Sequence, residues 1–165
     1  MRGEEVVGGV KVGFALRYEG LVKRVIVQYK YRFSEELVEV LGAILRERAG
    51  LVEDEVMIVA VPLHVRRWRQ RGFNQAELLG RALGEVNDCL ERVRWTGAQA
   101  KLGREERLVN LRGAFVVKAG YVVSGRRVLL VDDVCTTGST LRECVKVLEE
   151  AGAAEVKCLV LARGR

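Results

Sequence analysis

Two adjacent aspartates, Asp132 and Asp133, stand between an apolar run and a stretch rich in hydroxyl groups. The whole segment reads VLLVDDVCTTGSTL and covers residues 128–141. Carboxylates accept hydrogen bonds from sugar hydroxyls or ligate metal ions, whereas side-chain hydroxyls and bare backbone N–H groups bind anions. The four hydroxyl side chains and the glycine within residues 136–140 therefore favour an anion, and the aspartates favour a group that carries donors.

A helix is predicted directly after this stretch. Leu141, Cys144, Val145 and Leu148 recur at helical spacing, and the pattern stops near Gly152. A helix N-terminus presents unpaired N–H groups and a partial positive charge, so the loop before it suits a phosphate. Because carboxylates repel phosphate, the two aspartates are expected to face sugar hydroxyls or a metal-bound group. A sugar beside a phosphate indicates a ribose 5-phosphate.

The segment differs from two common phosphate-binding motifs. The motif G-x-x-x-x-G-K-[ST] does not occur, because Gly138 is followed by Ser-Thr-Leu, and no G-x-G-x-x-G follows a strand. Without a ligand, the aspartates would only begin a turn and Ser139 would only cap the helix. The succession of an apolar strand, two aspartates, the TTGST stretch and a helix favours a ligand site over this purely structural role.

Strands and helices alternate along the chain around this segment. Apolar runs predict buried strands at residues 56–61, 128–131 and 155–162, and further strands are expected at 89–95 and 114–117. Residues 8–20 are expected to form a strand or a hairpin. Helical patterns cover residues 21–30, 34–48, 74–88 and 141–152, with Ser34 and Asn74 as N-caps. This alternation predicts an α/β fold with a mainly parallel sheet flanked by helices. In such sheets ligands bind beyond the carboxyl ends of the strands, where the two aspartates are expected.

Composition indicates a single domain over residues 1–165. The chain is 49% hydrophobic and long enough to bury its own core, and it contains no repeat or long linker. Its apolar runs are too short to cross a bilayer, and its first residues, MRGEEVVGG, lack the pattern of a signal peptide. The four cysteines show no C-x-x-C or zinc spacing and are expected as free thiols. We therefore expect a cytoplasmic protein without membrane insertion.

Positive charge is concentrated in one part of the sequence. Residues 66–112 contain eleven Lys or Arg against six Asp or Glu, while the rest of the chain carries seventeen against sixteen. A concentrated basic region attracts anions, either the phosphates of a small molecule or those of nucleic acid. The alternative is a solvated surface without a ligand.

Several segments resemble a known family. VLLVDDVCTTGST resembles the phosphoribosyl pyrophosphate motif of type I phosphoribosyltransferases. VAVPLHVRRWRQRGFNQAELLGRAL, YEGLVKRVIVQYKY and KLGREERLVNLRGAF resemble the corresponding segments of its ComF/GntX branch, the group similar to competence protein ComF. The resemblance covers nearly the whole chain and implies the type I phosphoribosyltransferase fold with a small N-terminal hood. Members often begin with a cysteine-rich, zinc-binding segment, and this chain is expected to start after it.

The resemblance implies a reaction in which a nucleophile displaces pyrophosphate from C1 of phosphoribosyl pyrophosphate, with Mg²⁺ on the diphosphate. Asp132 and Asp133 would hold the ribose hydroxyls and offset the positive charge that develops on the sugar. The same two aspartates are the only candidate protein ligands for the magnesium. The 5-phosphate would be held by Thr136, Thr137, Gly138, Ser139 and Thr140.

The resemblance places the pyrophosphate contacts first in the segment after the strand at residues 56–61. Leu63, His64, Arg66 and Arg67 would border the diphosphate there. Arginine suits this role, because its guanidinium grips phosphate oxygens bidentately. His64 is the only histidine, and a structural role is its alternative.

A second set of contacts is implied for residues 96–110, which correspond to a mobile loop that closes over the substrate. Lys101 would act in catalysis, and Arg104 and Arg107 would reach the diphosphate. A solvated loop is the alternative.

Arg71, Asn74 and Gln75 match the family segment without an assigned role. Asn74 is expected either to contact a ligand or only to cap its helix. Trp68 and Trp95 would either stack on a base or serve in packing.

Three functional classes remain open. An enzyme would transfer phosphoribose to a base or amine with release of pyrophosphate, a regulator would sense the ligand, and a non-catalytic accessory of DNA uptake would bind single-stranded DNA beside the competence machinery. The basic residues accompany a complete phosphate motif and lack interleaved aromatics beyond Trp68 and Phe73, which favours the small ligand over DNA. The hood sequence at residues 8–20 does not predict the acceptor substrate. A homodimer is one option for the oligomeric state.

Overall fold

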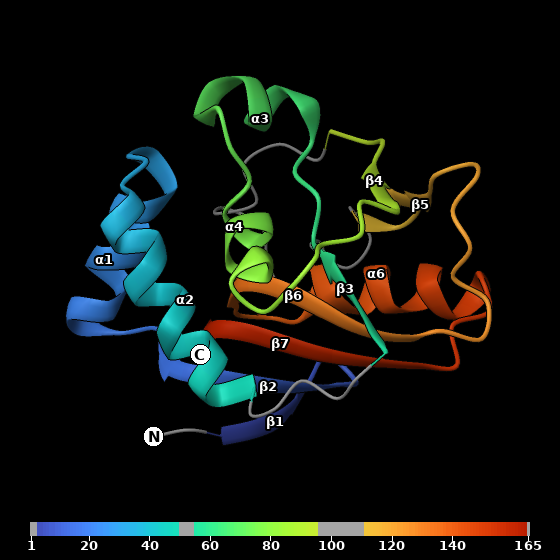
Figure 1. Cartoon of the computed structure of the whole chain (residues 1–165), viewed down its shortest axis with the longest axis horizontal. Coiled ribbons are helices and arrows are strands. Elements are labelled where there is room, and N and C mark those ends of the chain that lie inside the picture. The colour runs from blue at the N-terminus through green and yellow to red at the C-terminus, as the bar shows by residue number, and fades with distance from the viewer. Residues whose placement is uncertain (1–2, 50–54, 96–110, 165) are drawn as a thin grey trace.

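A five-stranded, mostly parallel sheet forms the centre of the protein (Figure 1). The computed structural model describes residues 3–49, 55–95 and 111–164. The strands lie in the order β1-β2-β7-β6-β3, and only β1 is antiparallel to its neighbour. Their bounds are β1 Gly3–Val7, β2 Val10–Arg17, β3 Val56–Ala60, β6 Arg127–Cys135 and β7 Glu155–Arg163. The predicted α/β class with a parallel sheet flanked by helices is confirmed.

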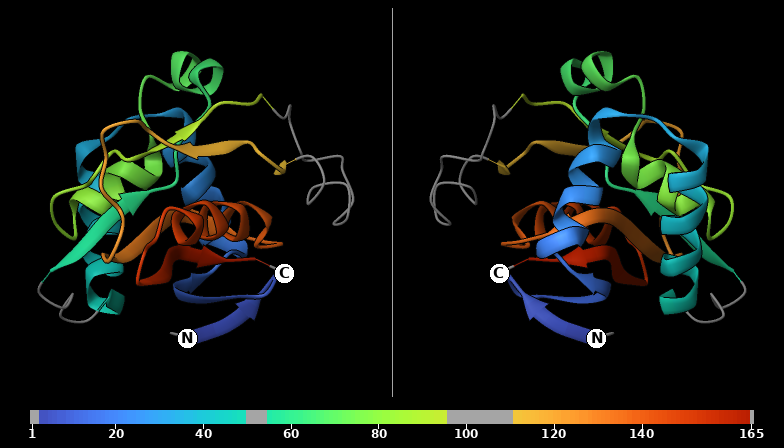
Figure 2. Two further views of the ribbon diagram at one scale, coloured as in Figure 1. Left: turned by 90° about the vertical axis from the view of Figure 1, so that its right-hand side faces the viewer. Right: turned by 90° about the vertical axis from the view of Figure 1, so that its left-hand side faces the viewer.

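Helices cover the two faces of this sheet (Figure 2). One face packs against α2 (Glu35–Ala49) and α4 (Gln75–Arg81), with α1 (Gly20–Tyr31) beside them. The other face packs against α6 (Ser139–Glu150) and a small antiparallel sheet of β4 (Leu90–Arg92) and β5 (Phe115–Val117). A short helix, α3 (Val65–Arg71), stands above the carboxyl end of β3 (Figure 1).

Two hydrophobic cores result from this layering. Alternate residues of a strand point to opposite faces of the sheet. In β6, Leu130 therefore packs toward α6 while Val131 packs toward α2 and α4. In β7, Val160 and Leu159 divide between the two cores in the same way. Strands buried on both faces account for the unalternating apolar runs of the sequence.

Helix α3 was not among the helices expected from the sequence, and three further elements differ from the prediction. Strand β6 continues through the two aspartates to Cys135, because its pairing with β7 extends to Arg163. Helix α4 ends at Arg81 instead of near residue 88, because the chain turns at Gly84. A Cβ at that glycine would lie 3.0 Å from Ile58 Cδ1.

The third difference concerns the N-terminal hood. β1 and β2 form an edge of the main sheet, because β2 pairs with β7 in parallel, from Val12 with Cys158 to Arg17 with Arg163. The small separate sheet is that of β4 and β5. Within the described residues, no helix combines the length and the apolar character that crossing a membrane requires.

Candidate active site at the carboxyl ends of β3 and β6

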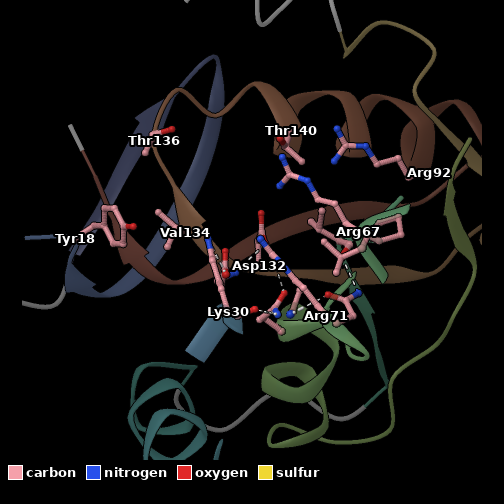
Figure 3. A pocket seen from close by; sticks show the side chains of 16 residues that line it. Tyr18, Lys30, Arg67, Arg71, Arg92, Asp132, Val134, Thr136 and Thr140 are labelled. Carbon is pink, nitrogen blue, oxygen red and sulfur yellow. Dashed lines mark hydrogen bonds and ion pairs between the residues drawn. The ribbon is translucent and has the colours of Figure 1, made fainter. Parts of the chain in front are cut away.

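A cleft of about 350 Å³ opens where β3 and β6 end (Figure 3). Its walls come from α1, the segment between β3 and α3, α3 itself, the start of α4, β4 and the end of β6. The lining residues are Tyr18, Lys30, Val61, Pro62, Leu63, Arg67, Arg71, Asn74, Gln75, Ala76, Arg92, Asp132, Asp133, Val134, Thr136 and Thr140. The position agrees with the rule that parallel sheets bind ligands beyond the carboxyl ends of their strands.

The two aspartates differ in their partners. Asp133 is buried and forms an ion pair with Lys30 from α1, with 3.0 Å between Oδ2 and Nζ. Asp132 Oδ1 accepts a hydrogen bond of 2.8 Å from the backbone N–H of Asp133. Lys30 therefore neutralises one carboxylate and leaves the other close to a like charge.

This arrangement shifts two pKa values. Burial and the negative charge of Asp133 raise the pKa of Asp132 to about 7. Burial disfavours the charged form of Lys30, but the attraction of Asp133 outweighs it, so the pKa of Lys30 lies above its ordinary value. At neutral pH Asp132 is thus close to its titration midpoint, and a cation or a donor beside it would favour the ionised form.

The stretch after Asp133 forms a second, smaller hollow of about 60 Å³, bounded mainly by residues 134–141. Gly138 precedes α6 and has a φ of 75°, in the left-handed region that favours glycine. The hydroxyls of Thr137 and Ser139 lie 2.9 Å apart within hydrogen-bond range. The loop therefore brings hydroxyls and the N-terminus of a twelve-residue helix to one small cavity, as a phosphate site requires.

The opposite wall of the cleft is strongly basic. Arg67 and Arg71 come from α3, and Arg92 comes from β4. Burial and the charge of Arg71 lower the pKa of Arg67, and burial and the charge of Arg67 lower the pKa of Arg92. Three guanidinium groups gathered in one cleft suit a polyanion.

Gln75 connects this basic wall to α1. Its side chain is 2% exposed, accepts a hydrogen bond of 2.9 Å from Arg71 Nη1 and donates one of 3.3 Å to the carbonyl of Lys30. The Tyr29 hydroxyl donates to the backbone carbonyl of Gln75 at 3.0 Å. The neighbouring residue, Asn74, caps α4 through Ala76 N–H and donates to the carbonyl of Val61. Both motif residues therefore position parts of the cleft.

Most residues singled out from the sequence meet in this region. Leu63, Arg67, Arg71, Asn74 and Gln75 line the cleft with the two aspartates, and residues 136–140 surround the smaller hollow. His64 and Arg66 do not line the cleft. His64 Nδ1 accepts from Arg66 N–H at the start of α3, and its ring lies 5.2 Å from that of Trp95.

Other residues of the site could not be assigned in the same way. Lys101, Arg104 and Arg107 lie outside the described residues. Lys30, Arg92 and Tyr18 line the cleft but were not singled out in the sequence. No spacing signal marks them, since each lies inside a helix or strand pattern or just beyond one. Among the described residues, no group of three or more His, Cys, Asp or Glu side chains could hold a metal ion.

Comparison with known proteins agrees with this geometry. The sequence profile of the phosphoribosyl transferase domain matches residues 93–165. Competence protein ComFC of Streptococcus pneumoniae is 36% identical over 156 residues, covering 94% of this chain and 69% of the relative. The chain belongs to the ComF-like family of type I phosphoribosyltransferases.

Two further relatives support this membership. Competence protein F of Haemophilus influenzae is 37% identical over 153 residues, which cover 87% of this chain and 66% of the relative. DNA utilization protein YhgH of Escherichia coli K12 is 41% identical over 133 residues, which cover 77% and 56%. The chain thus spans about two thirds or less of the length of several ComF-like relatives. The matched domain includes β6 and α6, while Lys30, Arg71 and Gln75 lie before it.

Proposed function

We propose that the protein binds phosphoribosyl pyrophosphate together with Mg²⁺. The observation that carries this proposal is the single cleft in which Asp132 and Asp133 lie between a hydroxyl-lined loop at a helix N-terminus and three arginines. The loop takes the 5-phosphate, the aspartates take the ribose hydroxyls, and Arg67, Arg71 and Arg92 take the diphosphate. Each part of the ligand then meets a group of complementary chemistry.

Magnesium enters on the diphosphate in this proposal. Mg²⁺ keeps several waters and binds through one or two carboxylates plus phosphate oxygens, so two aspartates suffice on the protein side. A dication near Asp132 also relieves the repulsion that raises the pKa of that carboxyl. When bound, the ion would neutralise charge on the leaving pyrophosphate.

The proposed activity is transfer of phosphoribose to a base or amine with release of pyrophosphate. As the bond from C1 to pyrophosphate breaks, positive charge grows on the sugar ring, and the carboxylates below it stabilise that charge. Lys30 holds the Asp133 carboxylate in place through their ion pair. Transfer is favoured over ligand sensing because preorganised carboxylates serve a cationic transition state more than a neutral sugar.

The test is to incubate the protein with phosphoribosyl pyrophosphate, Mg²⁺ and a panel of bases and amines while following pyrophosphate release. Acceptor-dependent release that Arg67→Ala abolishes supports a transferase. Binding without release, seen as a rise of the melting temperature, supports a sensor. If neither phosphoribosyl pyrophosphate nor ribose 5-phosphate shifts melting at about millimolar concentration, the proposal is wrong.

A second candidate is binding of single-stranded DNA at the rim of the cleft. Tyr31 is 73% exposed and lies 5.5 Å from the Arg71 guanidinium, while Trp95 is 39% exposed and lies 5.9 Å from that of Arg67. Trp68, 52% exposed, belongs to the same helix as the two arginines. Exposed rings beside arginines form stacking platforms for bases. The relatives' names, competence protein and DNA utilization protein, are consistent with this role.

This candidate makes a separate prediction. Single-stranded DNA should bind with an affinity that falls steeply with salt, in proportion to the number of phosphates contacted. Tyr31→Ala and Trp95→Ala should each weaken DNA binding about tenfold, because base stacking on an aromatic ring is lost. DNA binding that is insensitive to both substitutions would exclude this surface.

A further inference from the structure

The phosphate loop is supported from behind by the last strand of the sheet. Arg163, at the end of β7, donates from Nη1 to the carbonyl of Thr136 at 2.9 Å and to that of Cys135 at 3.3 Å. The backbone N–H of Gly164 donates to the same Cys135 carbonyl at 2.8 Å. Two successive carbonyls at the start of the loop are thus held toward β7.

Because of peptide geometry, fixing these two carbonyls also fixes the direction of the N–H groups that follow them. In a trans peptide the carbonyl and the N–H of the next residue point in opposite directions, and no described peptide bond is cis. With the carbonyls of Cys135 and Thr136 fixed toward Arg163, the N–H groups of Thr136 and Thr137 point away from it. The small hollow is lined by Thr136 and Thr137 and not by Arg163. These two N–H groups are therefore directed toward the proposed 5-phosphate.

Arg163 is itself held by the N-terminal hairpin. Its Nε lies 3.1 Å from Glu5 Oε2 in β1, and Glu5 Oε1 lies 2.7 Å from Arg17 of β2. The Arg163 side chain is only 14% exposed, so its guanidinium has little freedom to leave the loop. A guanidinium carries five donors in a fixed planar arrangement, which lets one side chain serve two carbonyls and a carboxylate together.

The same hairpin touches the loop directly. A Cβ on Gly138 would lie 2.5 Å from the carbonyl oxygen of Val7, and one on Gly8 would lie 2.9 Å from that of Thr137. Backbone therefore packs against backbone at the β1–β2 turn. The hairpin and Arg163 together enclose the loop on the side that faces away from the ligand.

We propose that Arg163 is a positioning residue for the 5-phosphate, acting through the carbonyls of Cys135 and Thr136 with Glu5 as its anchor. This inference rests on the proposed function. Arg163 touches no ligand, and its effect is confined to the half of the cleft that binds the phosphate ester. Substitution at Arg163 should therefore weaken ribose 5-phosphate without weakening inorganic pyrophosphate, which the arginines of the opposite wall hold.

The test measures both ligands by calorimetry, in the presence of Mg²⁺, with the full chain and with Arg163→Gln. Loss of charged donors to two carbonyls should weaken ribose 5-phosphate about tenfold or more and pyrophosphate less than about twofold. Arg163→Lys keeps the charge and one carbonyl contact, so it should lie between Arg163→Gln and the unaltered chain. Circular dichroism and thermal unfolding check that each variant is folded.

Two further variants complete the experiment. Lys11→Gln is the matched control, because it breaks the exposed ion pair with Glu4 in the same hairpin, 2.9 Å long, without touching the loop. Its affinities should equal those of the unaltered chain. If Arg163→Gln does not fold, Glu5→Gln replaces it and should weaken ribose 5-phosphate about threefold, because the anchor loses its charge while the carbonyl contacts remain.

The outcomes distinguish failure of the positioning role from failure of the proposed function. If the unaltered chain binds neither ligand, the proposed function is wrong and this inference falls with it. If it binds both, and the Arg163 variants lose neither or lose both equally, the positioning role is wrong while the proposed function stands. Selective loss of ribose 5-phosphate supports the positioning role.

Discussion

The two walls of the cleft are built in different ways. The wall that we assign to ribose and its phosphate comes from one continuous stretch, Asp132 to Thr140, at the junction of β6 and α6. The basic wall combines Arg67 and Arg71 of α3 with Arg92 of β4. The first relies on backbone conformation, whereas the second relies on long side chains, of which Arg71 is held by the buried Gln75.

This difference determines which substitutions should disrupt each wall. A backbone-built wall fails when a residue cannot adopt its φ or when an added atom meets neighbouring backbone. A wall built from side chains fails when a group that holds one of them is lost, and Gln75 ties Arg71 to the backbone of α1 here. Substitutions chosen on these grounds should damage one half of the ligand site and spare the other.

The largest effect is expected from Gly138→Ala. The residue has a φ of 75°, and its new Cβ would lie 2.5 Å from the Val7 carbonyl oxygen, so unfolding free energy should fall by about 2 kcal/mol or more. Ribose 5-phosphate binding should be lost as the loop shifts. Chemical unfolding and calorimetry measure the two effects.

Gly9→Ala is the matched control for that experiment. Gly9 also has a positive φ, 86°, but nothing lies within 4 Å of its ideal Cβ. The unfolding free energy of Gly9→Ala should therefore fall only by the cost of placing alanine at a positive φ, about 1 kcal/mol. Its affinity for ribose 5-phosphate should stay unchanged. Equal losses of unfolding free energy and of ribose 5-phosphate affinity in both variants would show that the contact with Val7 is unimportant.

Gln75→Leu should break the basic wall. It leaves the Lys30 carbonyl without the Nε2 donor and Arg71 without its Oε1 acceptor, so we expect a loss of about 2 kcal/mol in unfolding free energy. Pyrophosphate affinity should fall, while ribose 5-phosphate affinity should change little. If ribose 5-phosphate weakens just as much, the two walls are not independent.

The pH dependence of stability should report on Asp132. Its pKa in the folded protein, about 7, lies above the ordinary value of 3.8, so the folded state binds this proton more tightly than the unfolded state. The stabilisation is present at low pH and is lost as pH rises toward 7. Unfolding free energy should therefore decrease by about 1 to 2 kcal/mol from about pH 5 to about pH 7.

Asp132→Asn is the check on this assignment. The asparagine does not titrate, so the part of the slope that Asp132 causes should vanish in urea unfolding series measured across the same pH range. An unchanged slope would assign the proton to another group.

The smallest effect is expected from His64→Ala. The histidine accepts from Arg66 N–H at the start of the seven-residue helix α3 and does not line the cleft. The substitution should lower the unfolding free energy by less than about 1 kcal/mol and leave the affinities for ribose 5-phosphate and pyrophosphate unchanged. A large fall in turnover would instead give His64 a role in the reaction, through a conformation different from this one.

The sequence predicts more of the wall from Asp132 to Thr140 than of the basic wall. The first comes from one continuous stretch, whereas the second combines several elements. The wall assigned to ribose and its phosphate comes from residues that are neighbours in sequence. The succession of strand, aspartates, TTGST and helix therefore predicts it. Arg67, Arg71, Asn74 and Gln75 were singled out by family resemblance alone. Lys30 and Arg92 were missed because their place at the cleft depends on how α1 and β4 pack, which no local spacing encodes.

The fold shows the same division between local and long-range information. The parallel sheet followed from apolar runs that alternate with helical patterns. The early end of α4 did not, because Val86 forms a bridge with Ile58 on β3, a contact made only in three dimensions. The role of Arg163 was equally hidden, since its partners Glu5 and Thr136 lie far from it in sequence.

The support of the phosphate loop by both β1–β2 and β7 also has a consequence for biosynthesis. A nascent chain that has emerged only through α6 contains the whole VLLVDDVCTTGST motif but not Arg163. The pairing of β2 with β7 and the bonds from Arg163 to the loop form only after the last strand has been translated. We therefore expect newly made chains to gain affinity for ribose 5-phosphate abruptly, once β7 has left the exit tunnel and paired with β2, and not gradually as the motif appears.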